Sequence, residues 1–208
     1  MSYWVSPSTQ QRERRLSVSR IARAAARVLD RGGEGALSTR SVADELGVAP
    51  SSLYRHVRTK DHLLDLALDE VLARDLDRVT GGGLDAPHLL TRWFAHLTEH
   101  PWAAPAVLAR TPLGPAYLRL ADELCRALGD AGVPPRQVLA RSYSLTALVA
   151  GLAIAHTHHR GAQRPEDGYP VDLGSAPHLA EAVAAAQVGW ERTVRDSVTR
   201  LAGARRDR

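Results

Sequence analysis

Apolar residues recur along most of this chain at spacings of three and four positions, with polar residues between them. That spacing gathers apolar side chains on one face of an α-helix, whereas a half-buried strand would alternate apolar and polar residues. No region shows such alternation. The pattern therefore predicts an all-α fold.

Caps and breakers divide the pattern into helices. Ser17 is expected to cap the first helix, Ser38 or Thr39 the second and Thr59 the long helix, and Gly32-Gly33 is expected to end the first. Gly81-Gly82-Gly83 predicts a loop after a long helix, and the stretch from Gly161 to Ser175, rich in Gly, Pro and charge, is expected to be irregular. The predicted helices span residues 17–31, 38–46, 50–57, 60–79, 87–100, 102–109, 114–128, 135–160 and 177–202.

The segment Leu37–Leu72 combines two short helices, a tight turn and a long helix. Gly47 suits the left-handed residue that ends a helix, and Pro50 suits the first position of the next one. Leu53 and Val57 are predicted to point inward, which leaves the polar side chains of this helix outside. Such a pair could simply be two packed helices, but the agreement of cap, turn and outward polar set favours a helix-turn-helix DNA reader.

The outward side chains predict how DNA would be bound. Hydroxyls and arginine can read base edges in a major groove, whereas other contacts to phosphates position the protein. The residues expected at base edges are Arg40, Ser51, Ser52 and Arg55. Those expected at phosphates are Thr39, Tyr54, His56 and Lys60, and Pro50 starts the helix that carries most of this set.

Three sequence blocks carry a resemblance to a known family: L-S-T-R-S-V-A-D-E-L-G-V, S-S-L-Y-R-H-V and K-D-H-L-L-D-L-A-L-D-E-V-L. From about Leu16 to Leu76 the chain resembles the DNA-binding domain of the tetracycline-repressor (TetR) family, and the later chain resembles it more loosely. The resemblance implies a one-component repressor with a three-helix DNA-binding domain over residues 1–76. A larger helical domain over residues 77–208 would bind a small molecule and form a homodimer on a palindromic operator.

Charge distribution supports a nucleic-acid partner for the first part of the chain. Residues 1–60 hold 11 Arg or Lys and five Asp or Glu, a balance of +6, while the whole chain carries +4. Basic surface supplies the sequence-independent part of DNA binding. Arg12, Arg14 and Arg15 form either an arm that enters the minor groove or a solvated tail.

Other features of composition bound the setting. The single cysteine, Cys125, excludes an internal disulfide and indicates a reducing compartment. The first residues show no signal-peptide pattern, and no apolar run, including 145–155, is expected to be long enough to cross a bilayer. The chain is therefore predicted to be cytoplasmic, with no membrane partner and no cofactor.

Two helices of the later chain are predicted to form a subunit interface. The last helix has an apolar stripe from Leu179 to Leu201, and the helix from Pro135 mixes apolar with small residues that allow close approach. In a monomer both could be core, but the resemblance implies a four-helix bundle between two copies. The predicted interface residues are Leu148, Leu152, Val183, Trp190, Val194 and Val198.

The effector site is expected among the middle helices, where apolar walls with a few polar groups would suit a small molecule. The candidates, each of which could equally be ordinary core, are Trp93, Phe94, Leu97, Trp102, Val107, Leu108, Tyr117, Leu120, Leu124, Tyr143, Ala147 and Gly151. By the same resemblance, Leu76, Val107, Ala147 and Ala155 replace side chains that hold tetracycline or its magnesium ion, and Thr111 replaces a drug-contacting Arg. A lipophilic or aromatic effector is therefore expected instead.

Metal binding and catalysis have weaker support in the sequence. His156 and His159 share a helical face, but no nearby Cys, Asp or Glu completes a zinc site. No motif of a known catalytic type is present. Three functions thus remain in order of support: a ligand-released repressor, a DNA-binding or architectural protein without an inducer, and a helical enzyme with an accessory DNA-binding head.

Overall fold

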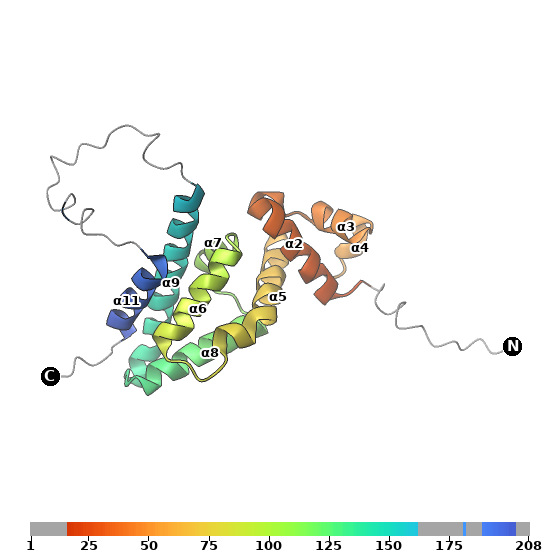
Figure 1. Cartoon of the computed structure of the whole chain (residues 1–208). Coiled ribbons are helices and arrows are strands. Elements are labelled where there is room, and N and C mark those ends of the chain that lie inside the picture. Colours follow the sequence, from red (N-terminus) through yellow and green to blue (C-terminus); the bar gives the residue numbers. More distant parts are fainter. Residues whose placement is uncertain (1–15, 162–180, 182–188, 203–208) are drawn as a thin grey trace, which may run out of the picture. The chain divides into compact units, whose positions relative to one another are not determined.

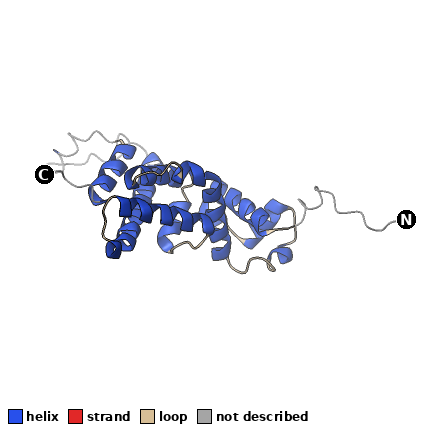
Figure 2. Cartoon of the chain, turned by 90° about the horizontal axis from the view of Figure 1, so that it is seen from below, coloured by secondary structure: helices blue, strands red, loops and turns tan. Residues whose placement is uncertain are grey.

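The computed structural model describes residues 16–161, 181 and 189–202 of the chain, and every regular element in this part is a helix (Figures 1 and 2). The predicted all-α fold is thereby confirmed. The arginines of the N-terminal arm, the expected irregular stretch at 162–175, and Leu179 and Val183 of the last predicted helix lie outside the described residues.

The chain forms two compact units. The first comprises residues 1–75 together with 112–118, and the second comprises residues 76–111 and 119–208. The sequence-based boundary after residue 76 lies next to this division but misses the segment 112–118, which returns to the first unit. Two helices, α5 (Lys60–Thr80) and α8 (Pro115–Asp130), run across the division.

The first unit begins with α2 (Val18–Ala36), α3 (Thr39–Leu46) and α4 (Pro50–Leu53), followed by α5. Its predicted caps form. The Ser17 side chain accepts a hydrogen bond from the Arg20 amide at 3.3 Å. Ser38 and Ser41 form a reciprocal capping box at the start of α3, and Thr59 Oγ1 accepts from the His62 amide at 3.1 Å. Each cap satisfies an N–H group that the helix itself leaves unpaired.

One end of α2 differs from the prediction. Helical residues continue past Gly32-Gly33 to Ala36, with a break at Gly33, whose φ of 65° and ψ of −168° are not helical. The glycine pair therefore interrupts the helix without ending it, because the chain resumes a helical turn on the far side.

A small apolar core holds the first unit together. α2 packs against α3, and α3 against α4. Leu53 and Val57, which were predicted to point inward, are buried, as are Leu64 and Leu68 of α5. The fully buried part of α2 includes Ile21 and Leu29.

The second unit contains α6 (Ala86–Glu99), α7 (Ala103–Ala109), α9 (Pro135–Gly161) and α11 (Trp190–Ala202), with the greater part of α8. α6 packs against α9 and α11, and α7 packs against α9 (Figure 1). Asp85 caps α6 by accepting from the His88 amide at 2.9 Å. The buried side chains at the centre of this unit include Trp93, Leu97 and Val149.

The last helix is shorter than predicted. Gly189 is not helical, and α11 begins at Trp190. A single continuous helix over 177–202 is therefore wrong, since glycine at 189 separates α11 from the chain before it.

The expectation that no apolar stretch is long enough to cross a bilayer is wrong for α9. Its residues Pro135–His158 are long and apolar enough to cross a membrane by length and composition. One such helix is weak evidence for a membrane span, and core helices of globular domains share this property. One side of α9, with Leu145, Val149 and Ala153, is buried against its neighbours.

Candidate nucleic-acid interface and effector region

A tight glycine turn sets the geometry between α3 and α4. Gly47 has φ 66° and ψ 36°, the left-handed conformation that side chains disfavour. Its amide and that of Val48 donate to carbonyls at the end of α3. α4 itself is only four residues long, but the amides of His56 and Val57 both donate to the Leu53 carbonyl, at 2.8 and 2.9 Å, so the backbone continues through one more helical turn.

This turn exposes the polar side chains on which DNA binding was predicted. Tyr54 is 59% exposed although its neighbour Leu53 is fully buried. Among the other candidates, Arg40, Pro50, Ser51, Arg55 and Lys60 are exposed, and Thr39, Ser52 and His56 are half-buried. The two helices of the motif thus expose polar side chains, while their apolar side chains Val42, Ala43 and Leu53 are buried.

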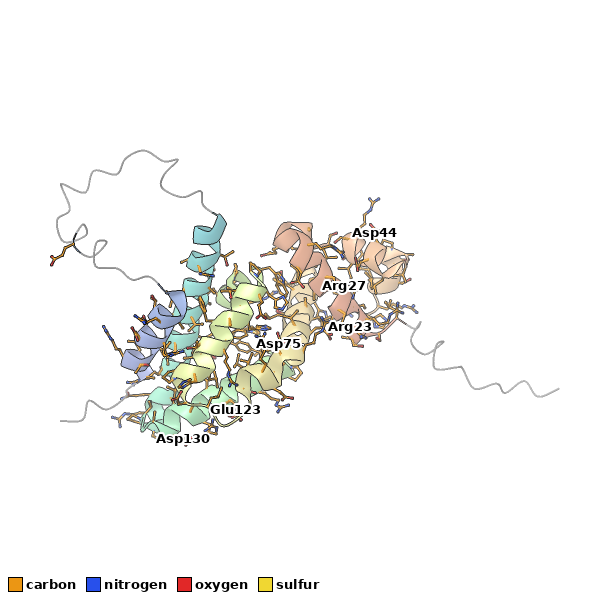
Figure 3. All side chains as sticks on the ribbon, viewed as in Figure 1. Arg23, Arg27, Asp44, Asp75, Glu123 and Asp130 are labelled. Carbon is orange, nitrogen blue, oxygen red and sulfur yellow. The ribbon has the colours of Figure 1, made fainter. Side chains whose placement is uncertain are left out.

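The arginines of the first unit fall into two groups. Arg27 and Arg31 on α2 both pair with Glu45 of α3, and Arg74 pairs with Glu70 on α5 at 2.8 Å; Figure 3 marks Arg27 on α2. Hydrogen bonds from Arg31 and then Arg27 lower the pKa of Glu45 below its usual value. The two pairs with Glu45 link α2 to α3, whereas the Arg74–Glu70 pair lies within α5.

The second group lies on the helix-turn-helix itself. Arg40, Arg55 and Arg58 are exposed, and among the described residues none of them has an ion pair. Guanidinium groups without an internal carboxylate remain available to phosphates and base edges. The ion pairs therefore engage Arg27 and Arg31 of α2, whereas Arg40 of α3 and the two arginines after α4 remain outside them.

The second unit contains a row of aromatic and imidazole rings. Trp93 stacks on His96 with ring centres 5.2 Å apart, His96 lies 5.1 Å from His100, and the His100 ring is 6.1 Å from Trp102. Phe94 meets His156 edge-on at 5.6 Å. His96 and His100 were not among the predicted site residues, although the successive spacings of three and four positions from Trp93 are those of residues on one face of a helix and its C-cap.

The predicted effector residues fall into a buried and an exposed set. The buried ones are Trp93, Phe94, Leu97, Trp102, Val107, Tyr117, Leu120 and Leu124. Leu108, Tyr143, Ala147 and Gly151 are exposed. Tyr117 belongs to the first unit, whereas the rest belong to the second. The candidate effector residues, which were predicted to line a single pocket, therefore differ in burial and do not all belong to the same unit.

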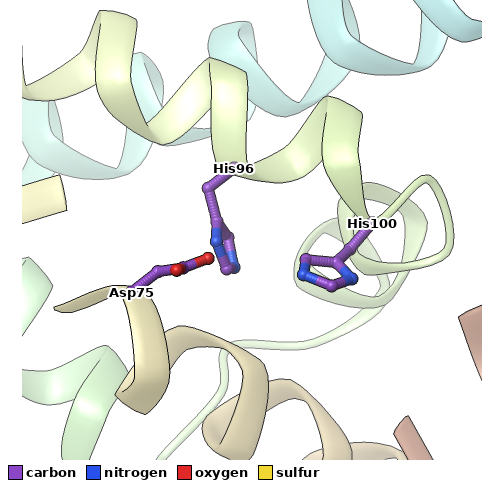
Figure 4. Close-up of side chains that lie close together, drawn as sticks. All are labelled: Asp75, His96 and His100. Carbon is purple, nitrogen blue, oxygen red and sulfur yellow. The ribbon is translucent and has the colours of Figure 1, made fainter. Parts of the chain in front are cut away.

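His96 and His100 are candidate metal ligands in the second unit, because their rings lie close together. His96 and His100 lie at the end of α6 and just after it (Figure 4). Within the described part of the second unit, no third His, Cys, Asp or Glu lies close enough to complete a site with them; Asp75, drawn with them, belongs to the first unit. Protein zinc sites use at least three protein ligands. The side chain of His159 lies outside the described residues.

The predicted dimer residues are placed unevenly. Val194 and Val198 are 0% exposed within the single chain, so they belong to its own core and leave a partner nothing to contact. Leu148 and Leu152 on α9 are half-buried, and the side chain of Trp190 lies outside the described residues. The exposed side of α9 carries Leu139, Ala140, Tyr143, Ala147 and Gly151.

A capped helix-turn-helix with unpaired arginines, followed by a helical unit with an aromatic interior, is the architecture of a DNA-binding regulator. The profile described as "Bacterial regulatory proteins, tetR family" matches residues 15–67. "Tetracyclin repressor-like, C-terminal domain" matches residues 88–193. The chain belongs to the TetR family of transcriptional regulators.

Individual relatives agree with this assignment. An HTH-type transcriptional regulator of Saccharopolyspora erythraea is 35% identical over 158 residues, which are 74% of this chain and 67% of the relative. The HTH-type transcriptional repressor DrrR1 of Streptomyces coeruleorubidus is 30% identical over 153 residues, 72% of this chain and 57% of the relative. The Streptomyces coelicolor TetR family protein ActR, solved in complex with actinorhodin, has a TM-score of 0.70 and 23% identity, covering 91% of this chain and 99% of that one.

The family membership carries several general properties. Regulators of this family are non-enzymatic, soluble cytoplasmic DNA-binding proteins. They bind operator DNA and small-molecule ligands and form dimers.

Proposed function

We propose that this chain is a homodimeric transcriptional repressor that binds a palindromic operator and is released from it by a lipophilic or aromatic small molecule. It would act in the cytoplasm, where operator DNA is available. The observation that carries the proposal is the exposed Arg40, Tyr54 and Arg55 above buried Leu53, on a helix-turn-helix whose preceding helix, α2, has Arg27 and Arg31 paired with Glu45.

The DNA-binding part assigns different roles to different side chains. Arg55 lies on the helical turn that follows α4 and would reach base edges, with Arg40, Ser51 and Ser52 beside it. Thr39, Tyr54, His56 and Lys60 would contact phosphates. Contacts to base edges decide sequence preference, whereas contacts to phosphates strengthen binding to every duplex alike.

The first test uses a duplex that the wild-type protein selects from a random pool. Arg55→Ala should weaken binding to this duplex more than to a scrambled one, because a good arginine–base contact contributes about 1–3 kcal/mol of discrimination. Lys60→Ala is the matched control and should weaken both duplexes alike. Fluorescence anisotropy at one fixed salt concentration measures all four affinities. Equal losses for Arg55→Ala would place its side chain on phosphate, and failure of the wild type to select any duplex would refute the function.

The effector part rests on the rings of the second unit. Trp93, Phe94 and Trp102 are buried rings of its interior, and the imidazoles of His96 and His100 pack against Trp93 and Trp102. Aromatic rings stack on one another in offset or edge-on geometry. A planar aromatic molecule therefore fits this chemistry, and ActR, a protein of the same fold, was solved with actinorhodin.

Release of the selected duplex tests the effector. Magnesium–tetracycline should not release it, because Leu76, Val107, Ala147 and Ala155 offer no ligand to a hydrated cation, whose desolvation would be uncompensated. Actinorhodin and a panel of hydrophobic antibiotics and dyes are the aromatic probes. Release by magnesium–tetracycline at micromolar concentration would refute the aromatic-effector proposal. Absence of release by every probe would favour the second candidate, a DNA-binding regulator without an inducer.

A further inference from the structure

The start of α8 is capped by a side chain from a different helix. Gly114 occupies the cap position, since its carbonyl accepts the first helical hydrogen bond, from the Leu118 amide at 3.0 Å. Asp69 of α5 accepts at Oδ1 from the amides of Ala116, at 2.8 Å, and Tyr117, at 3.4 Å. These are the second and third amides of the helix, which a cap residue's own side chain normally satisfies.

Gly114 is what allows Asp69 to reach these amides. Its φ is not in the left-handed region, so the backbone conformation there does not require glycine. A Cβ at position 114 would instead clash with the carboxylate of Asp69. The start of α8 is therefore capped not by a neighbouring side chain but by Asp69, which lies 47 residues before Ala116 in the sequence.

The contact between Asp69 and the start of α8 joins two helices that each run from one unit into the other. α5 starts at Lys60, a few residues after the turn that carries Tyr54 and Arg55. The first turn of α8 belongs to the first unit, and its residues 119–130 belong to the second. Asp69 thus ties the helix that follows the DNA-binding motif to a helix that continues into the proposed effector unit.

We propose that Asp69 is a positioning residue whose cap on α8 holds α5 in the arrangement that binds DNA, so that losing the cap weakens operator binding. This inference rests on the proposed function as a DNA-binding regulator. A local cap would stabilise α8 equally well without involving α5, and that difference makes the two roles of Asp69 separable.

The experiment compares three variants of the full chain. Asp69→Ala removes the cap. Asp69→Ala/Gly114→Ser gives α8 a local hydroxyl cap, for which the missing carboxylate leaves room, while α5 stays detached. Asp69→Asn keeps an oxygen acceptor at the same place. The rate of hydrogen exchange at the Ala116 and Tyr117 amides measures whether the cap is present. Fluorescence anisotropy with the duplex selected by the wild type measures DNA binding.

Exchange of both amides should accelerate in Asp69→Ala and return toward the wild-type rate in the double variant. Duplex binding should nevertheless fall by roughly five-fold or more in both, the lower range of measured couplings between sites. Asp69→Asn should stay close to the wild type. Asp77→Ala, an exposed residue of the same helix, controls for charge. Losing a negative charge by itself favours DNA binding, so weaker binding cannot be a charge effect.

Wild-type affinity in the double variant would overturn the proposal, because the cap would then serve only the stability of α8. Unchanged amide exchange in Asp69→Ala would overturn the cap itself. If Asp69→Ala fails to fold, the double variant still separates the two roles. If the wild type selects no duplex, the proposed function fails and the positioning role fails with it, whereas amide exchange still tests the cap.

Discussion

The two units of this protein differ in how their helices are defined. In the first unit, local residues set almost every helix boundary: Ser17, the Ser38–Ser41 box, Gly47 and Thr59. In the second, Asp85 caps α6, but α7 begins at Trp102 without a side-chain cap. Local rules fix geometry independently of the rest of the chain, which suits a surface that must match one regular partner, duplex DNA. The second unit depends more on packing between its helices, since α6 packs against α9 and α11, and α7 packs against α9.

This contrast predicts that the second unit, not the first, carries the association of two copies. Ala147→Arg on the exposed side of α9 should convert a dimer to monomers, because an unpaired charge buried at an interface costs several kcal/mol. Analytical ultracentrifugation across micromolar concentrations gives the result. Ala131→Arg, exposed in the turn after α8, is the control and should leave the dimer intact. A dimeric Ala147→Arg variant would mean that this side of α9 is free surface.

The two cores can be weakened separately. Leu53→Ala and Leu97→Ala each remove a fully buried leucine, one from each unit, and each should cost about 2–5 kcal/mol of unfolding free energy. Leu53→Ala should abolish duplex binding while the fluorescence of Trp93 and Trp102, both in the second unit, stays native at low denaturant. Leu97→Ala should perturb that fluorescence.

The measurement is urea unfolding, followed in a Trp4→Phe/Trp190→Phe background so that only the two interior tryptophans report. If each variant lost duplex binding and native tryptophan fluorescence together, the two units would unfold as one. The difference between the units would then lie in how their helices are capped and not in their stability.

The difference between local caps and long-range contacts also explains which features could be predicted from the sequence. The caps, the Gly47 turn and the inward Leu53 could be predicted because each depends on residues a few positions apart. The contact between the Phe94 and His156 rings and the Asp69 cap on α8 could not, since the partners in each are far apart in the sequence and meet only after folding. Val194 and Val198 were assigned to a dimer interface because a helical stripe shows which side is apolar, but not whether the same chain or a second copy covers it.

The left-handed turn between α3 and α4 offers a smaller effect confined to the first unit. Gly47→Ala should destabilise it by about 1–2 kcal/mol, the cost of placing a side chain in that conformation. No atom lies near a Cβ built there, so the loss would come from the backbone alone. Denaturant unfolding of the variant measures it. Gly129→Ala, in a helical turn of α8 with equally open space, should be neutral or slightly stabilising, and an equal loss at both glycines would contradict the turn argument.

The smallest expected effect concerns Glu45, whose ion pairs join α2 to α3. Its folded-state pKa is lowered by hydrogen bonds from Arg31 and then Arg27, so it binds a proton less readily in the folded than in the unfolded chain. Its contribution to stability is therefore fully present above the unfolded pKa and is lost as pH falls through the folded one. Because all three side chains are partly exposed, Glu45→Gln should cost about 0.2–1 kcal/mol at pH 7. The difference from wild type should shrink on acidification below the usual glutamate range. Urea unfolding at pH 7 and at successively lower pH measures it, with Asp44→Asn on the same helix as the control. A difference that grows toward acid would contradict the assigned direction.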